Sequence, residues 1–305
     1  HDTRGAVKLE ADSSVFHKST DHECTSFQEA IEKKKLGMKI MVREGSSAKN
    51  MDDLLNIDDR MNYLIEEEMA GNMEIENLDE ALTVPPFDFL VCDDIDAEDL
   101  SEGHLDNLVK KAISLKINPK EAIKMVTFNP AEHYGLNCGA IDNGRIANFC
   151  LVDDLRNLNV SKVWVHGELV VDDGEVLFET EVVKSKDSII LDEVKAEDFD
   201  AVMEMSYVNS LMDETTNVFV INAFDGQLLT EKSEETLLVK NKIIQPDLNK
   251  DIVKIAIVNR YGGNDITNGF IKGFNLKKGA FGASVAHDSH NILVIGTNSE
   301  DMAKV

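Results

Sequence analysis

The stretch from Thr20 to Ser47, "TDHECTSFQEAIEKKKLGMKIMVREGSS", contains a polar motif, a helical pattern, an apolar run and a second polar motif, in that order. Phe27, Ala30 and Ile31 share one face of a helix that the spacing predicts over residues 26–36. The apolar run "GMKIMV" (37–42) then predicts a short buried strand. The first polar motif therefore comes directly before the predicted helix, and the second comes directly after the predicted strand.

The same order repeats further along the chain. A second helical pattern runs from Met51 to Leu64, and an acidic, loosely patterned segment (65–86) leads to the apolar run "FDFLV" (87–91), which ends in "CDDID". Such alternation predicts βα units around a parallel sheet or barrel. In such barrels the functional groups lie where strands end, and "DHE", "REGS" and "CDD" each occupy such a place.

The rest of the chain predicts two further domains. Asn118-Pro119 and Asn129-Pro130 each predict a helix that starts at an N-cap, and Gly135 is placed to end the second one. From Gly139 the pattern changes to period two with tight turns at His166-Gly167 and Asp173-Gly174, which predicts a small antiparallel β unit. We expect domains over residues 1–135, 136–190 and 191–305, the last an α+β domain.

Composition excludes several partners and locations. The formal charge of −26 makes nucleic acid an unfavourable partner, because phosphate is repelled by such a surface. No apolar run approaches the ~18 to 20 residues that span a bilayer, and we expect no membrane partner. The four cysteines form no CxxC pair, which favours a reduced, cytoplasmic setting.

His22 and Asp93 are the strongest candidates for chemistry among the polar residues. Each follows a predicted strand, and a histidine with a carboxylate at such positions suggests a metal-dependent hydrolase. Asp93 and Asp94 could instead cap the helix that begins near Asp99 or Leu100. His287 and His290, which flank Asp288 in "SVAHDSHN", could bind metal or substrate or could be surface polarity.

Several segments resemble the adenine deaminases of the amidohydrolase superfamily. The "DHECTS" motif, "REGS", "NPAEHYGL" with "GAIDNGRIAN", and the late "VAHDSHN" stretch carry the resemblance, which extends over nearly the whole chain. It implies the C-terminal half of a (βα)8 barrel, of the α/β class, with a small β-sandwich unit and a C-terminal α+β domain. The implied reaction is hydrolytic deamination of adenine to hypoxanthine and ammonia, a step of purine salvage, at a binuclear manganese or iron centre.

The resemblance also assigns roles residue by residue. His1, His22 and Asp93 are the expected metal ligands, and Asp93 and Glu23 are the expected catalytic carboxylates. The expected substrate-binding residues are Arg43, Glu44, Ser46, His287 and Asp288.

Part of the family's metal site has no counterpart in this sequence. The family's His-x-His pair and bridging Glu should precede His1, so we expect the N-terminal part of the barrel to be lacking and the isolated chain to turn over adenine poorly. An opened barrel would need a complementing N-terminal polypeptide or self-association into a homo-oligomer. Two alternatives stay open: a non-catalytic relative that binds purine or a partner chain, and an amidohydrolase acting on another ring, such as a cyclic amide.

Overall fold

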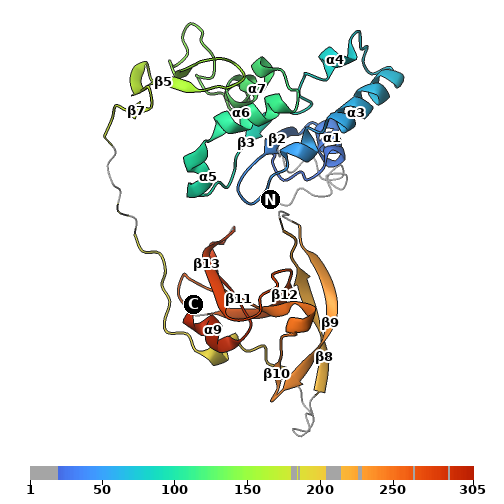
Figure 1. Ribbon diagram of the computed structural model, residues 1–305, viewed down its shortest axis with the longest axis vertical. Helices are drawn as coiled ribbons and strands as arrows, with labels where there is room; N and C mark the ends of the chain where they lie inside the picture. The colour runs from blue at the N-terminus through green and yellow to red at the C-terminus, as the bar shows by residue number, and fades with distance from the viewer. Residues whose placement is uncertain are drawn as a thin grey trace. The chain divides into compact units, whose positions relative to one another are not determined.

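The computed structural model describes residues 20–179, 184, 186–203, 214–225, 229–263, 265–287 and 289–305. It divides the chain into two compact units, residues 1–181 and 182–305 (Figure 1). The first unit contains a parallel sheet with its helices and a small antiparallel sheet. The second contains a larger sheet. The expected domain limits at residues 135 and 190 stay predictions.

Three parallel strands form the centre of the first unit. They are β1 (Thr20–Asp21), β2 (Lys39–Arg43) and β3 (Phe89–Val91), hydrogen-bonded in the order β1-β2-β3. Thr20 pairs with Lys39, and Met41 pairs with Phe89. Ile40 and Val42 are fully buried, as expected of a strand covered on both faces. The parallel arrangement confirms the βα units predicted from the alternating pattern. It also places the carboxyl ends of all three strands at the same edge of the sheet.

The first predicted helix is present in the structure, whereas the second predicted helix is divided into two. Helix α1 (Phe27–Lys35) is capped by Ser26, whose hydroxyl accepts from the Glu29 amide at 3.3 Å, and it buries Phe27, Ala30 and Ile31. The single helix predicted over residues 51–64 is wrong, because α2 (Met51–Leu54) and α3 (Ile57–Met69) are separate. Asn56 causes the break, since its side chain accepts from two amides at the start of α3.

The remaining helices of this unit lie between residues 78 and 134 of the chain. They are α4 (Leu78–Ala81), α5 (Ala97–Glu102), α6 (Leu105–Ser114), α7 (Pro119–Val126) and α8 (Phe128–Tyr134). Asn118 caps α7 as predicted, but Asn129 does not cap α8, which already begins at Phe128. The Asn129 amide instead donates to the Asp88 carbonyl at 3.0 Å. Gly135 ends α8 in the left-handed conformation, as its position predicted.

A small antiparallel sheet completes the first unit. Strands β4 (Phe149–Val152), β5 (Val160–Val165), β6 (Glu168–Asp172) and β7 (Glu175–Val176) pair in chain order. His166-Gly167 and Asp173-Gly174 all have positive φ, which confirms the predicted turns. Where we expected a small β sandwich, the described strands β4 to β7 form a single antiparallel sheet, and Phe149, Leu151 and Val176 remain exposed on it.

The second unit is an α+β domain, as predicted. Its strands are β8 (Glu214–Asn222), β9 (Glu231–Lys240), β10 (Ile243–Ile244), β11 (Ile252–Val258), β12 (Ile266–Lys272), β13 (Ala280–Ala286) and β14 (Asn291–Gly296). They form one sheet in the order β10-β9-β8-β12-β11-β14-β13, with β8 and β12 parallel and the other pairs antiparallel. Helix α9 (Ser299–Lys304) and the 3₁₀ helices η2 (Ala196–Phe199) and η3 (Leu248–Lys250) accompany it.

None of the helices in the described ranges combines the length and the apolar character that crossing a membrane requires.

Candidate functional site

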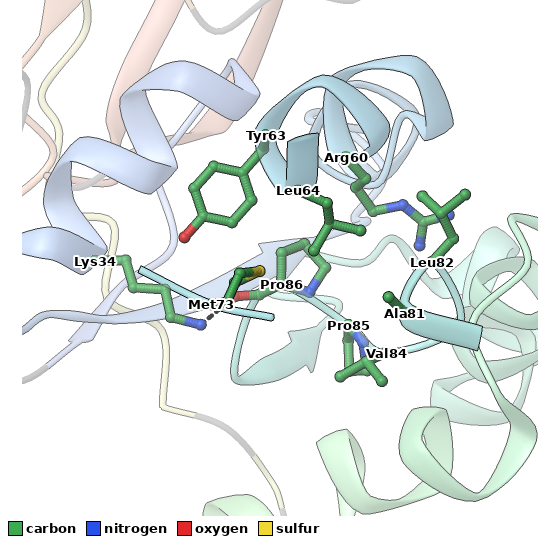
Figure 2. Close-up of a pocket in the computed structure, with 10 residues that line it drawn as sticks. All are labelled: Lys34, Arg60, Tyr63, Leu64, Met73, Ala81, Leu82, Val84, Pro85 and Pro86. Carbon is green, nitrogen blue, oxygen red and sulfur yellow. Dashed lines mark hydrogen bonds between the residues drawn. The ribbon is translucent and has the colours of Figure 1, made fainter. Parts of the chain in front are cut away.

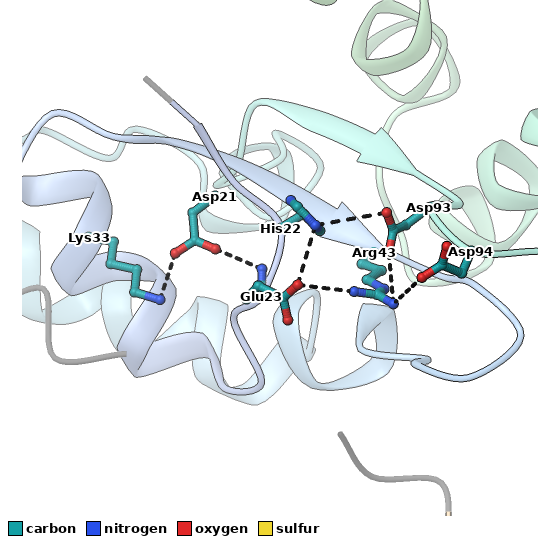
Figure 3. Close-up of polar contacts among 7 residues, drawn as sticks. All are labelled: Asp21, His22, Glu23, Lys33, Arg43, Asp93 and Asp94. Atoms are coloured by element: carbon teal, nitrogen blue, oxygen red, sulfur yellow. Dashed lines mark hydrogen bonds and ion pairs between the residues drawn. The ribbon is translucent and has the colours of Figure 1, made fainter. Parts of the chain in front are cut away.

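Side chains from the ends of the three parallel strands meet at one edge of the sheet (Figure 3). His22 and Glu23 follow β1, Arg43 ends β2, and Asp93 follows β3. His22 Nε2 lies 3.3 Å from Glu23 Oε1 and 3.8 Å from Asp93 Oδ1. The structure therefore brings together His22 and Asp93, which are 71 positions apart in the sequence, because β1 and β3 both run parallel to β2 between them and all three carboxyl ends lie on the same side.

Arg43 joins the carboxylates of this edge to one another. Its Nη2 lies 2.7 Å from Asp93 Oδ2 and 3.5 Å from Asp94 Oδ2, and its Nη1 lies 3.4 Å from Glu23 Oε1. Arg43 is 4% exposed, whereas the side chains of Asp93 and Asp94 are 28% and 44% exposed, so water screens these contacts in part. We call the group formed by these residues the strand-end cluster: His22, Glu23, Arg43, Asp93 and Asp94.

A buried ion pair supports the loop that carries His22. Lys33 of α1 is 1% exposed, and its Nζ lies 2.6 Å from Asp21 Oδ2 and 2.7 Å from Glu29 Oε1. Asp21 Oδ1 also accepts from the Glu23 amide at 2.7 Å. Burial opposes the positive charge of Lys33, but its hydrogen bonds to Asp21 and Glu29 raise its pKa above the ordinary value. The pair fixes the backbone on both sides of His22.

Cys24 lies in the same loop and is an inert thiol. Its side chain is 1% exposed. Burial, helped by the nearby negative charge of Asp21, raises the pKa of the Cys24 thiol to about 12. A thiol that stays protonated to this degree is a poor nucleophile. Cys24 therefore packs in the core beneath the cluster.

The loops after β2 and β3 approach so closely that only glycine fits between them. A Cβ on Gly45 would lie 2.4 Å from the Cys92 carbonyl oxygen and 2.6 Å from that of Asp94. The Ser46 amide donates to the Asp94 carbonyl at 2.9 Å, and the Ser46 hydroxyl donates to Asp99 Oδ2 at 2.5 Å. Asp93 itself has a φ of 53°, a left-handed conformation that Asp tolerates better than most residues. These contacts fix where Asp93 stands relative to Arg43.

Two residues predicted to bind substrate make structural contacts in this unit. The Glu44 carboxylate accepts from Lys111 Nζ at 2.7 Å and from the Met51 amide at 3.2 Å. The Ser46 hydroxyl accepts from the Asp96 amide at 2.8 Å, in addition to its bond with Asp99. Sequence reasoning did not identify Lys33 or Lys111. The one available signal for Lys33 was its place three residues after buried Ala30 on the same helix.

The other predicted site residues lie elsewhere. His1 and Asp288 are outside the described residues. His287 belongs to the second unit, where its ring packs edge-on against His290 with centroids 4.7 Å apart. A contact that sequence reasoning missed lies next to Asp93, where Cys92 Sγ and His104 Nε2 are 3.1 Å apart.

Family models cover most of the chain. Residues 8–170 match the model of the amidohydrolase family, and residues 227–305 match the model of the adenine deaminase C-terminal domain. The first match alone covers more than half of the 305 residues. The chain belongs to the amidohydrolase family.

Among curated proteins, the chain is similar to several adenine deaminases. It is 39% identical over 285 residues to the adenine deaminase of Methanosphaera stadtmanae and 41% identical over 286 residues to that of Methanothermobacter thermautotrophicus. These matches cover 93% and 94% of this chain but only 46% and 47% of the relatives, so the chain spans about half of their length. Among solved structures, a β-aspartyl dipeptidase from Fervidobacterium islandicum is 20% identical, with a TM-score of 0.37, over 59% of this chain and 47% of that one.

Membership of this family implies a divalent metal ion. The strand-end cluster offers an imidazole nitrogen and carboxylate oxygens, which are common donors for such ions. Within the part of the chain that the structure describes, however, no group of three or more His, Cys, Asp or Glu side chains is arranged to hold an ion. Arg43 already contacts the Asp93 and Glu23 carboxylates. The described residues by themselves therefore do not make a complete metal centre.

Proposed function

We propose that this chain provides the strand-end cluster and the C-terminal domain of an adenine deaminase, which converts adenine and water to hypoxanthine and ammonia. The observation that carries the proposal is the convergence of His22, Arg43 and Asp93 at one sheet edge. Two facts support the choice of substrate: residues 227–305 match an adenine deaminase C-terminal domain, and the curated relatives bear that name.

The reaction transfers both protons of the attacking water. Water forms a bond to C6 of the purine as the C6–N bond breaks; one proton of the water leaves with the ammonia, and the other ends on the ring. We assign this transfer to Asp93, with Glu23 as the second carboxylate, because general acid–base groups must stand within reach of the reacting atoms. Arg43 holds Asp93 Oδ2 at 2.7 Å, so it fixes the orientation of the carboxylate while Oδ1 faces His22.

We further assign the family's ion to Mn²⁺ or Fe²⁺, with His22 and Asp93 among its ligands and His1 as a third. Arg43, Glu44, Ser46, His287 and Asp288 remain the proposed substrate contacts. The position of Arg43 within the cluster supports its assignment, whereas the Glu44 carboxylate is already bound by Lys111. We place the enzyme in the cytoplasm and in purine salvage. Its four free cysteines agree with a reducing compartment.

A second candidate is a relative that binds purine, or a complementing polypeptide, without turnover. Apolar side chains exposed on the small antiparallel sheet favour it, because Phe149, Leu151 and Val176 would be covered by another chain or by a second copy. In this case the cluster would serve binding alone.

One experiment separates the two candidates. The purified chain is incubated with adenine and Mn²⁺, alone and together with the remaining part of the Methanothermobacter relative, and hypoxanthine is measured by chromatography. We expect little product from the chain alone and clear product from the mixture. Purine binding without product in the mixture would favour the second candidate. As a matched control, the mixture is repeated with a His22→Ala chain, which should form no product.

A further inference from the structure

A polar cavity of about 440 Å³ lies in the second unit. Its walls come from η2, β10, η3, β11 and the junction between β14 and α9, and its described lining includes none of the residues assigned to the proposed reaction. Its volume is within the ~300 to 1,000 Å³ typical of small-molecule sites, whereas the cavity of about 200 Å³ beside α1, α3 and α4 in the first unit is below that range (Figure 2). The cavity of the second unit is therefore large enough for a small organic molecule.

A buried network of polar side chains joins three walls of this cavity. Lys254 of β11 is 4% exposed, and its Nζ lies 3.2 Å from Asp200 Oδ1 and donates to the Ser299 hydroxyl. The Ser299 hydroxyl in turn donates to the same Asp200 oxygen at 2.6 Å. All three residues line the cavity. Because the network ties the end of η2 to β11 and to α9, the cavity is formed before any ligand enters it.

Other side-chain donors of the lining are also used within the unit. The Gln245 amide donates to the Ile243 carbonyl at 3.0 Å. The Thr297 hydroxyl donates to the Gly279 carbonyl at 3.2 Å. The Asn298 amide donates to the Thr297 hydroxyl at 3.3 Å and to a carboxylate of α9 at 2.8 Å. Each of these donors, like those of the buried network, therefore has an acceptor inside the unit.

The acceptors of the lining are not used to the same extent. The Asp200 side chain is 18% exposed, and among the described residues only its Oδ1 accepts hydrogen bonds. The carboxylates of Glu197 and Glu300 are exposed and form no ion pair with any described Lys or Arg. The described lining thus has three carboxylates and one ammonium, that of Lys254. A cation is attracted to such a lining and an anion is repelled.

Apolar side chains form the rest of the lining. Ile243, Ile244, Pro246 and Leu248 are half-buried and leave apolar surface facing the cavity. Covering this surface with an apolar group is favourable, because it removes apolar area from water. A ligand for this cavity thus needs a cationic donor at one end and a compact apolar body.

We propose that this cavity binds a small organic amine whose ammonium group donates to the Asp200 carboxylate and whose apolar body lies against Ile244 and Leu248. The exposed carboxylates of Glu197 and Glu300 add to the attraction for the cation. The inference is independent of the proposed deaminase activity.

Benzylamine, which is protonated at pH 7, is a suitable probe, with benzyl alcohol as its neutral counterpart. Calorimetric titration of the 305-residue chain should show benzylamine binding at least about tenfold tighter, because only benzylamine forms a charge-assisted hydrogen bond with a carboxylate. Asp200→Asn should abolish this preference. The double variant Glu197→Gln, Glu300→Gln leaves the buried network intact and should weaken benzylamine binding severalfold. Glu231→Gln with Glu234→Gln removes two exposed carboxylates outside the cavity and should leave binding unchanged. Equal affinity for the two probes, or equal losses in the two double variants, would overturn the proposal.

Two more variants protect the test against misfolding and against binding elsewhere. Ala196→Trp fills the cavity while Asp200 is intact, and it should abolish benzylamine binding without changing the circular dichroism spectrum. Asp93→Asn removes a carboxylate of the strand-end cluster and should leave benzylamine binding intact. If Asp93→Asn abolishes binding and Ala196→Trp does not, benzylamine binds at the cluster and the proposed site is wrong.

Discussion

Asp93 and Arg43, from the ends of neighbouring parallel strands, form an ion pair in which Oδ2 lies 2.7 Å from Nη2. The other oxygen of Asp93 faces His22 Nε2 at 3.8 Å. One carboxylate therefore has two distinct roles in the cluster: one oxygen is held by a buried cation, and the other is directed towards the imidazole. This division makes Asp93 the residue whose charge matters most for the proposed reaction.

The first prediction concerns Asp93→Asn. Asn has the same shape and tolerates a positive φ, so the loop should keep its conformation. In the complemented assay, loss of the carboxylate should lower kcat by roughly 10²- to 10⁴-fold, the usual contribution of a positioned acid–base group. Asp94→Asn is the matched control, because Asp94 is 3.5 Å from Arg43 and more exposed. Equal losses in the two variants would contradict the role given to Asp93.

The second prediction concerns the ion pair beneath His22. Lys33→Met leaves the buried Asp21 carboxylate without the Lys33 ammonium, and we expect the free energy of unfolding to fall by about 3–5 kcal/mol. The only tryptophan, Trp164, lies in the same unit, so its fluorescence during urea unfolding reports the change. Lys35→Met, which removes an exposed ion pair with Glu67, is the control and should leave the free energy of unfolding unchanged. A small effect of Lys33→Met would mean that the pair contributes little.

The third prediction concerns Gly45→Ala. The new methyl group would lie 2.4 Å from the Cys92 carbonyl oxygen, so the loops after β2 and β3 must move apart. We expect a loss of about 1–3 kcal/mol in stability, typical of overpacking, and reduced activity as Asp93 moves away from Arg43. Thermal unfolding and the complemented assay measure the two effects. Gly269→Ala, where the methyl group meets only Ile255 Cγ2 at 3.5 Å, should change neither.

The fourth prediction concerns alkaline pH. The pKa of Cys24 is about 12 in the folded chain and near 9.0 when exposed. Between these values the unfolded chain has lost the thiol proton and the folded chain has kept it, so stability falls as pH rises, by up to about 1.4 kcal/mol per pH unit from this group. Urea unfolding of the chain and of Cys24→Ala at pH 8 and pH 10.5 should show a smaller fall for the variant. Parallel falls would show that Cys24 is not responsible.

The fifth prediction concerns the metal. The described donors do not complete a centre, so the isolated chain should bind Mn²⁺ weakly, and the mixture with the remaining part of a relative should bind it much more tightly. Equilibrium dialysis with metal analysis measures both affinities without any turnover. In the mixture, His22→Ala should weaken binding. Tight binding by the isolated chain would contradict the prediction.

Sequence periodicity predicted α1, β2 and β3, but no apolar run marks the two-residue strand β1 that precedes His22. Alternation of helical and apolar runs predicts parallel strands, and parallel strands bring His22 and Asp93 together whatever their separation in sequence. Local patterns could not predict how side chains pair. Lys33 stands in the run "KKK", which is normally solvated, and only the approach of β1 to α1 shows that it is buried against Asp21. The break at Asn56 was missed because the apolar spacing continues across it, although Asn is a favoured N-cap residue.

Because the Lys33–Asp21 ion pair is buried, its strength should depend little on the salt concentration. Mobile ions screen exposed charges over a distance of about 10 Å at 0.1 M, and the surface of a chain with a net charge of −26 is sensitive to such screening. A pair that is 1–2% exposed is largely out of their reach. Ionic strength should therefore alter how charged molecules approach this protein without loosening the support beneath His22.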